Sequence, residues 1–113
     1  MCSEIDLEQI LSEVYSEFQS IFDTNLQGVI LYGSYARGDF DEESDLDIVA
    51  LVNMDRYALK NYDKKIVSFT SRMDMKYNML ISATTIPYVE FVQYKDDIPY
   101  YANIAREGVS LSA

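Results

Sequence analysis

The sequence predicts an α/β domain in which helices flank a mixed β-sheet of three to four strands. Three observations predict it: an amphipathic helical pattern over residues 3–22, a wholly apolar run at residues 48–52, and a helical stripe over residues 59–73. Helical and extended patterns alternate along the chain, and this order is typical of a sheet covered by helices.

The first element expected is a helix over residues 3–22. Ser3 can cap it, and Glu4 and Asp6 lie in the first turn, where the helix dipole favours anions. Its apolar residues recur at spacings of three and four, namely Leu7, Ile10, Leu11, Val14, Phe18, Ile21 and Phe22. Residues 28–32 then form a short β-rich run that we interpret as the first strand.

The second strand is expected at residues 45–52, because a continuous apolar run is typical of a strand buried on both faces. Asn53 or Asp55 then caps a second helix that continues to about Met73. Residues 77–84 are expected to form the third strand.

The last quarter of the chain gives weaker patterns. Residues 88–94 fit either a helix or a strand. Asp97 and Pro99 predict the start of a final helix, and Gly108 predicts a left-handed stop to it. Residues 109–111 are expected to add a short strand.

Length and charge limit the possible functions. The chain has 113 residues, which suits one domain over residues 1–113, and nineteen acidic residues against nine basic ones give a formal net charge of −10. Affinity for DNA or RNA depends largely on basic contacts to phosphate, so this composition argues against a long nucleic acid. It favours a small metal-bound nucleotide or a positively charged protein partner, while acidity that only aids solubility is an equally good interpretation.

Composition also excludes several kinds of site. The chain has no histidine, which removes serine–histidine and cysteine–histidine catalysis and the common zinc sites. No signal-peptide pattern and no apolar run of ~18 residues is present, so we expect a cytoplasmic protein that does not contact a membrane. An aromatic group near the C-terminus can form an exposed face for a partner, a second copy of the chain included; it comprises Tyr88, Phe91, Tyr94, Tyr100 and Tyr101.

Gly33 and Ser34 form a candidate phosphate-binding turn. A strand that ends in glycine and turns into a helical start leaves backbone N–H groups pointing the same way, which favours an anion. Gly33 allows a phosphate to approach the main chain closely, and Ser34 adds a hydroxyl donor. Taken alone, a serine N-cap after a glycine turn is the commoner meaning of such a pair.

Asp45 and Asp47 form a candidate metal site. Alternation along a strand sends both carboxylates to one face, about 6–7 Å apart along the chain. Two hard oxygen ligands at a strand end suit one or two Mg²⁺ ions, which take their other ligands from water and substrate phosphates. A solvated strand end is the usual meaning of Asp-x-Asp alone, but here the pair follows the phosphate-binding turn after ten residues.

Two competing motifs fail. If the segment from Asp39 were a calcium-binding loop, its sixth position should be glycine and its twelfth glutamate, but these positions are Ser44 and Ala50. As a P-loop, the glycines at 33 and 38 are followed by Asp39 and Phe40 where lysine and serine or threonine should stand.

The combined motif resembles the signature of minimal nucleotidyltransferase (MNT) domains of the polymerase-beta-like nucleotidyltransferase superfamily. It consists of Gly33-Ser34, ten residues and Asp45-x-Asp47, with Ala36-Arg37-Gly38 and Ser44 between them. The signature spans some 20 residues, and both its spacing and its flanks agree. The order of elements and the tail over residues 97–109 extend the resemblance more loosely to the whole chain, which implies a small nucleotidyltransferase fold.

The resemblance implies roles for five residues. Gly33 and Ser34 would contact the phosphates of ATP or another nucleoside triphosphate, and Asp45 and Asp47 would hold Mg²⁺ and carry catalysis. Arg37 would pair with phosphate or brace the acidic loop. Stand-alone members often act as antitoxins beside a small helical HEPN protein, and some transfer AMP from ATP to a tyrosine of that partner.

One departure from the family pattern concerns a third carboxylate on the strand after the second helix. Our alignment places Asn78 at that position, and an amide cannot accept a proton near neutral pH. Asp74, expected in the turn before the strand, could substitute only if the loop folds back. Three functions therefore stay open: transfer of a nucleotidyl group to a protein partner, binding of the partner without catalysis, and, more weakly, transfer to a small molecule.

Overall fold

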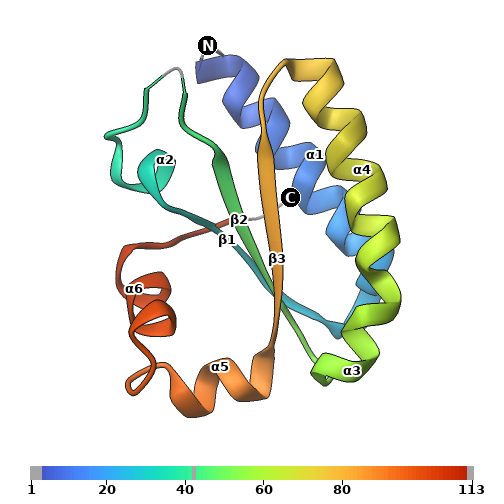
Figure 1. Ribbon diagram of the computed structural model, residues 1–113, viewed down its shortest axis with the longest axis vertical. Coiled ribbons are helices and arrows are strands. Elements are labelled where there is room, and N and C mark those ends of the chain that lie inside the picture. The colour runs from blue at the N-terminus through green and yellow to red at the C-terminus, as the bar shows by residue number, and fades with distance from the viewer. Residues whose placement is uncertain (1–3, 42, 112–113) are drawn as a thin grey trace.

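A four-stranded mixed sheet with the strand order β3–β2–β1–β4 lies at the centre of the molecule (Figure 1). The computed structural model describes residues 4–41 and 43–111. Strand β1 runs antiparallel to β2 and β4, and β2 runs parallel to β3. The elements in chain order are α1 Glu4–Phe22, η1 Asp23–Asn25, β1 Leu26–Tyr32, α2 Ser34–Arg37, β2 Leu46–Val52, α3 Arg56–Leu59, η2 Lys60–Tyr62, α4 Asp63–Tyr77, β3 Ile81–Pro87, α5 Tyr88–Tyr94, α6 Pro99–Glu107 and β4 Val109–Ser110.

Helices α1 and α4 cover one face of the sheet (Figure 1). The apolar stripe of α1 supplies Val14 and Phe18, both with no exposed surface, and Phe18 meets Phe69 of α4 edge to face at 5.2 Å between ring centroids. The even-numbered residues of β2, such as Leu46 and Ile48, belong to the same cluster. Burying a side chain of this size stabilises the fold by about 1.5–3 kcal/mol, so this layer fixes the sheet.

Helices α5 and α6 lie over the other face, where they cover only one end of it. The odd-numbered Val49 and Leu51 of β2 pack there with Ile86, Phe91 and Ile104. Asp47 precedes them on the same face because side chains alternate along a strand. The sheet therefore has one face that is open near the start of β2 and closed near its end.

The predicted mixed sheet is confirmed, but the prediction of the third strand was wrong in its start. Helix α4 continues to Tyr77, and β3 begins at Ile81 rather than at residue 77. Asn78 is the C-cap of α4 in a left-handed conformation, with φ 51° and ψ 48°, which asparagine tolerates better than most residues. Asp74 lies in α4 rather than in the turn, and its carboxylate accepts a hydrogen bond of 2.9 Å from the Ile81 N–H.

The remaining elements follow the sequence with small changes. Asp55 caps α3 by accepting a 2.7 Å hydrogen bond from the Ala58 N–H, as expected, but the single helix expected from there to Met73 is divided into α3, η2 and α4. Residues 88–94 are helical. The expected left-handed stop at Gly108 was wrong, because this residue is extended with φ −70°. Glycine is needed there for space, since a Cβ would overlap the Ile30 side chain and the Ile104 carbonyl. The expected cap Ser3 lies outside the described residues.

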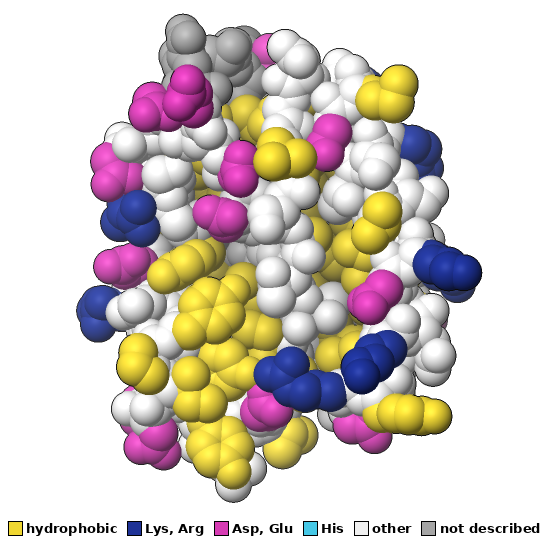
Figure 2. Space-filling model, in the orientation of Figure 1, with side chains coloured by type: hydrophobic (Ala, Val, Ile, Leu, Met, Phe, Trp, Pro, Cys, Tyr) yellow, Lys and Arg dark blue, Asp and Glu magenta, His cyan; other side chains and the backbone are white. Residues whose placement is uncertain are grey.

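The C-terminal aromatic residues divide between core and surface. Tyr101 and Phe91 are buried, with ring centroids 5.6 Å apart, whereas Tyr88, Tyr94 and Tyr100 are exposed. Figure 2 shows hydrophobic side chains gathered over α5 and α6, below an area that is rich in acidic side chains. Of the helices in the described ranges, none combines the length and the apolar character that a bilayer crossing requires.

Candidate active site

The structure brings the Gly33 turn and the Asp47 carboxylate into contact. Tyr32, the last residue of β1, pairs with Asp47 of β2, so Gly33 leaves the sheet beside this carboxylate. Gly33 has φ 76° and ψ −153°, a conformation that is essentially restricted to glycine. A Cβ on Gly33 would overlap Oδ2 of Asp47 and stand 3.3 Å from its Cγ. Although ten residues lie between the two motifs in sequence, Gly33 and Asp47 are in contact in the structure.

A single helical turn, α2, follows Gly33. The N–H groups of Ala36 and Arg37 both donate to the Gly33 carbonyl at 3.1 Å, and the Gly38 N–H donates to the Ser34 carbonyl at 2.9 Å. Ser34 is half-buried as the first residue of this turn. Because the N–H groups at the very start of a helix have no acceptor within it, such a turn beside a candidate metal site favours a phosphate.

Asp45 and Asp47 lie at the open end of the sheet. Asp45 is exposed directly before β2, and Asp47 is half-buried as its second residue. Burial raises the pKa of the Asp47 carboxyl, the charge of Asp45 raises it further, and the Arg37 guanidinium lowers it. Two carboxylates that repel each other in this way are stabilised by a cation.

Arg37 braces the acidic loop, one of the two roles expected for it. Its Nε lies 3.2 Å from a carboxylate oxygen of Asp39, and a terminal nitrogen lies 3.6 Å from Glu107 of α6. The hydrogen bond with Asp39 is the main reason why the pKa of Arg37 is raised. Pairing of Arg37 with phosphate remains a prediction, and its effect on Asp47 shows that its charge reaches the site.

The loop between α2 and β2 is ordered by one of its own acids. Asp41 Oδ1 accepts hydrogen bonds from the Glu43 N–H at 2.9 Å and from the Ser44 hydroxyl at 3.2 Å, and the Asp41 N–H donates to Ser44 Oγ at 2.9 Å. The Asp41 carboxylate thus shapes the loop that leads into Asp45.

Strand β3 forms the other side of the site, and the residues of β3 that face the site carry hydroxyl groups. Ser82 pairs with Asp47 and Thr84 pairs with Val49, so both lie on the open face. Asn78, four residues before Ser82, is not on this strand and does not replace a third carboxylate. If the sequence analysis had placed the start of this strand at Ile81, the alternation of side chains would have identified Ser82 as a residue that faces the site.

Tyr100 of α6 completes the site, whereas the sequence pattern indicated it only as part of an exposed aromatic face for a partner. Its ring meets Tyr32 edge to face at 6.0 Å between centroids, and its hydroxyl lies near the Thr84 side chain of β3. Burial raises the pKa of the Tyr100 phenol, the Thr84 side chain lowers it, and Tyr32 and Asp47 raise it further. Its position depends on α6 folding back over the sheet, which is a tertiary feature.

The fold agrees with comparisons to known proteins. A family model described as "Nucleotidyltransferase domain" matches residues 7–104. The chain belongs to this family. Among its relatives is a Methanocaldococcus jannaschii protein named "Putative protein adenylyltransferase MJ0141", 36% identical over 97 residues, which are 86% of this chain and 96% of that protein. The similarly named MJ0604 of the same organism is 29% identical, over 89% of this chain and 93% of that protein.

Solved structures show the same nucleotidyltransferase fold. A chain from a crystal structure of a toxin–antitoxin with AMP-PNP aligns with a TM-score of 0.55 and 18% identity, over 91% of this chain and 73% of that one. A chain from the MntA-HpeT toxin–antitoxin mutant D39ED41E aligns with a TM-score of 0.54 and 16% identity, over the same shares of the two chains.

The donor set of this nucleotidyltransferase domain fits Mg²⁺. Within residues 4–41 and 43–111, no three acidic or thiol side chains gather into a metal-binding group. Two carboxylates beside a phosphate-binding turn are a suitable set for an ion that keeps waters and takes phosphate oxygens as further ligands. The close approach of Gly33 to Asp47 provides a place where a phosphate and a carboxylate could share one cation.

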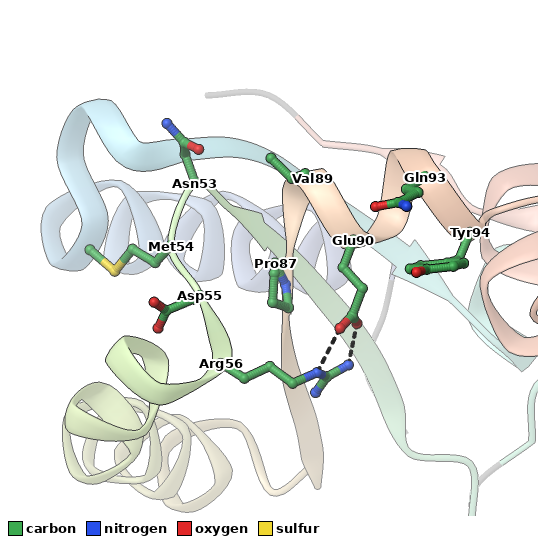
Figure 3. A pocket seen from close by; sticks show the side chains of 9 residues that line it. All are labelled: Asn53, Met54, Asp55, Arg56, Pro87, Val89, Glu90, Gln93 and Tyr94. Atoms are coloured by element: carbon green, nitrogen blue, oxygen red, sulfur yellow. Dashed lines mark hydrogen bonds and ion pairs between the residues drawn. The ribbon is translucent and has the colours of Figure 1, made fainter.

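A cavity of about 470 Å³ lies at the opposite end of the sheet, after β2 and β3 (Figure 3). Arg56 forms a bidentate ion pair with Glu90 across it, with Nε 2.9 Å from Oε1, and its terminal nitrogen donates to the Tyr101 hydroxyl at 2.7 Å. These contacts attach α5 and α6 to the end of the sheet. Since Asp45 and Asp47 lie at the other end, this cavity is separate from the candidate active site.

Proposed function

We propose that the chain is a cytoplasmic, Mg²⁺-dependent nucleotidyltransferase that moves AMP from ATP to a protein partner, and that this partner is a HEPN-type toxin. The contact between the Gly33 main chain and the Asp47 carboxylate is the observation that carries the proposal. The names of the two M. jannaschii relatives support protein adenylylation, and the names of the fold neighbours support a toxin–antitoxin setting.

In this proposal each residue has a defined task. The Gly33–Ser34 turn would orient the β- and γ-phosphates, and Asp45 and Asp47 would hold the cation beside this turn and so position the triphosphate for transfer. Bound Mg²⁺ would neutralise the charge that develops on the triphosphate during transfer. Arg37 keeps the acidic loop in place through Asp39.

The acceptor's proton leaves without help from a protein carboxylate on β3. Strand β3 carries Ser82 and Thr84 on the open face, and neither hydroxyl is a base near neutral pH. The proton therefore passes to water or to a phosphate oxygen.

The direct test is transfer of label from ATP to the protein encoded beside this chain. We expect Mg²⁺-dependent labelling that is lost in the Asp45→Asn, Asp47→Asn double variant. Asp23→Asn is the matched control, because Asp23 is an exposed aspartate with φ 50° at the other end of the sheet and asparagine accepts this conformation equally well. Labelling that survives in the double variant would refute the site.

A second candidate is a domain that neutralises its partner by binding alone. It is favoured by the absence of an acid on β3, since loss of a general base costs about 10²–10⁴-fold in rate. Ser82→Asp separates the two, because Ser82 is in register with Asp47. An inert wild type that gains transfer from Ser82→Asp would establish the binding role, whereas robust transfer by the wild type would exclude it.

A further inference from the structure

The strand order divides the site into a leaving side and an entering side. Gly33 and Ser34 follow β1, which lies on one side of Asp47, and β3 lies on the other. In an in-line displacement, the attacking and leaving oxygens stand on opposite sides of the phosphorus. With the pyrophosphate over the Gly33 turn, the acceptor hydroxyl must approach over β3.

The Tyr100 hydroxyl already lies on this entering side. It reaches β3 at Thr84, while the Tyr100 ring rests against Tyr32, the pairing partner of Asp47. Figure 1 shows α6 on the same side of the sheet as α2, below it. The next residue, Tyr101, is 5% exposed and anchors α6, so Tyr100 is held in place although 43% of its surface is exposed.

We infer that Tyr100 is a self-acceptor: in the absence of a partner, the domain transfers one AMP from ATP to the Tyr100 hydroxyl. This inference rests on the proposed function. The Tyr100 Oη attacks the α-phosphorus, the Oη–P bond forms, the bond from the α-phosphorus to the pyrophosphate oxygen breaks, and pyrophosphate leaves. The phenol proton passes to water through the exposed side of the ring.

Three other tyrosines are less well placed for this reaction. Tyr94 lines the cavity at the opposite end of the sheet, and Tyr57 of α3 lies at that end too. Tyr35 is buried, and its ring is stacked on Phe40 at 4.3 Å between centroids. Tyr100 alone among these four belongs to the face that carries Asp47.

An AMP group on Tyr100 would lie over the entering side and block a second acceptor. Self-transfer is therefore limited to one nucleotide per chain, and the modified domain is inhibited toward its partner. This gives the site a state in which it is switched off by its own product.

The test uses the full chain with labelled ATP and Mg²⁺, without partner. We expect one AMP per chain by intact mass and its location on Tyr100 by peptide mass spectrometry. Tyr100→Phe, which keeps the ring contacts, should lower labelling to background, whereas the matched variant Tyr94→Phe should label like the wild type. The labelled fraction should grow at the same rate when the protein is diluted, because donor site and acceptor belong to one chain.

The outcomes separate this inference from the proposed function. Label on the partner but none on the chain itself overturns self-transfer and leaves the proposed function intact. Label on neither protein overturns both. Self-labelling at another residue, or labelling that persists in the Asp45→Asn, Asp47→Asn variant, also overturns the assignment of Tyr100.

Discussion

Replacement of Gly33 by alanine tests the contact on which the site depends. Backbone conformations open only to glycine cost other residues about 1–3 kcal/mol, and Gly33 has φ 76° and ψ −153°. The new Cβ also overlaps Oδ2 of Asp47, and overpacking of this kind costs about 1–3 kcal/mol. Alanine lowers the entropy of the unfolded chain, which offsets about 0.4–1 kcal/mol. We expect Gly33→Ala to lower the free energy of unfolding by about 3 kcal/mol.

Gly38→Ala is the matched control, because Gly38 also has a positive φ, 86°, but a Cβ there meets no atom within 4 Å. We expect it to cost only about 1 kcal/mol, the penalty of a left-handed conformation. Urea denaturation gives both values, and transfer of AMP to the partner gives the catalytic effect. Since a displacement of about 1 Å can cost on the order of 10²-fold in rate, Gly33→Ala should nearly abolish transfer while Gly38→Ala keeps it.

A double-mutant cycle isolates the contact with the carboxylate. In an Asp47→Ala background the clash partner is gone, so Gly33→Ala should cost about 1–2 kcal/mol less than in the wild type. If the cost of Gly33→Ala is the same in both backgrounds, the reasoning from the Gly33–Asp47 contact is refuted.

Three further changes test the electrostatics, the corrected strand and the opposite end of the sheet. Burial and Asp45 raise the pKa of the folded Asp47 carboxyl, so this group holds its proton more tightly in the native state than in the unfolded chain. Its contribution to stability is fully present below about pH 4 and is lost as pH rises through its folded pKa. In urea titrations at several pH values, the free energy of unfolding of the metal-free wild type should therefore fall relative to that of Asp47→Asn as pH rises. Asp74→Asn should lower the free energy of unfolding by about 0.5–1.5 kcal/mol, because it weakens the hydrogen bond that the Asp74 carboxylate accepts from the Ile81 N–H. Neither Asp74→Asn nor Asn78→Asp should change the rate of AMP transfer. A rate change in either variant contradicts our placement of both residues outside the site. Tyr101→Phe removes a buried hydroxyl that lies between Arg56 and Glu90. It should lower the free energy of unfolding, measured by urea denaturation, by about 1–2 kcal/mol without loss of AMP transfer.

Patterns within single elements were sufficient to predict most of the fold. The spacing of apolar residues in α1 and the apolar run of β2 each depend on local sequence, and both elements end within one residue of the expected limit. The two motifs of the site could also be predicted, because β1 and β2 are consecutive strands that pair with each other. Gly33 and Asp47 therefore meet without help from distant segments.

The start of β3 could not be predicted, because contacts between distant elements set it. Lys76 Nζ lies 2.9 Å from Glu13 of α1, and the Tyr77 hydroxyl donates to the same carboxylate at 2.5 Å. These contacts extend α4 into residues that a local pattern assigns to a strand. The pKa of Glu13 is lowered by Tyr77 first and then by Lys76, so the pair stabilises this arrangement when the carboxylate is charged.

The corrected register also indicates which acceptor the site suits. Ser82, not an acid, stands beside Asp47, so an incoming hydroxyl must lose its proton without a carboxylate from β3. A phenol has a pKa of about 10, far below that of water or of an aliphatic hydroxyl, so a tyrosine loses its proton far more readily than an aliphatic hydroxyl would. A missing base therefore costs least when the acceptor is a tyrosine. The same argument applies to a tyrosine on a partner and to Tyr100. These two tyrosines would therefore compete as acceptors at the same entering side of the site.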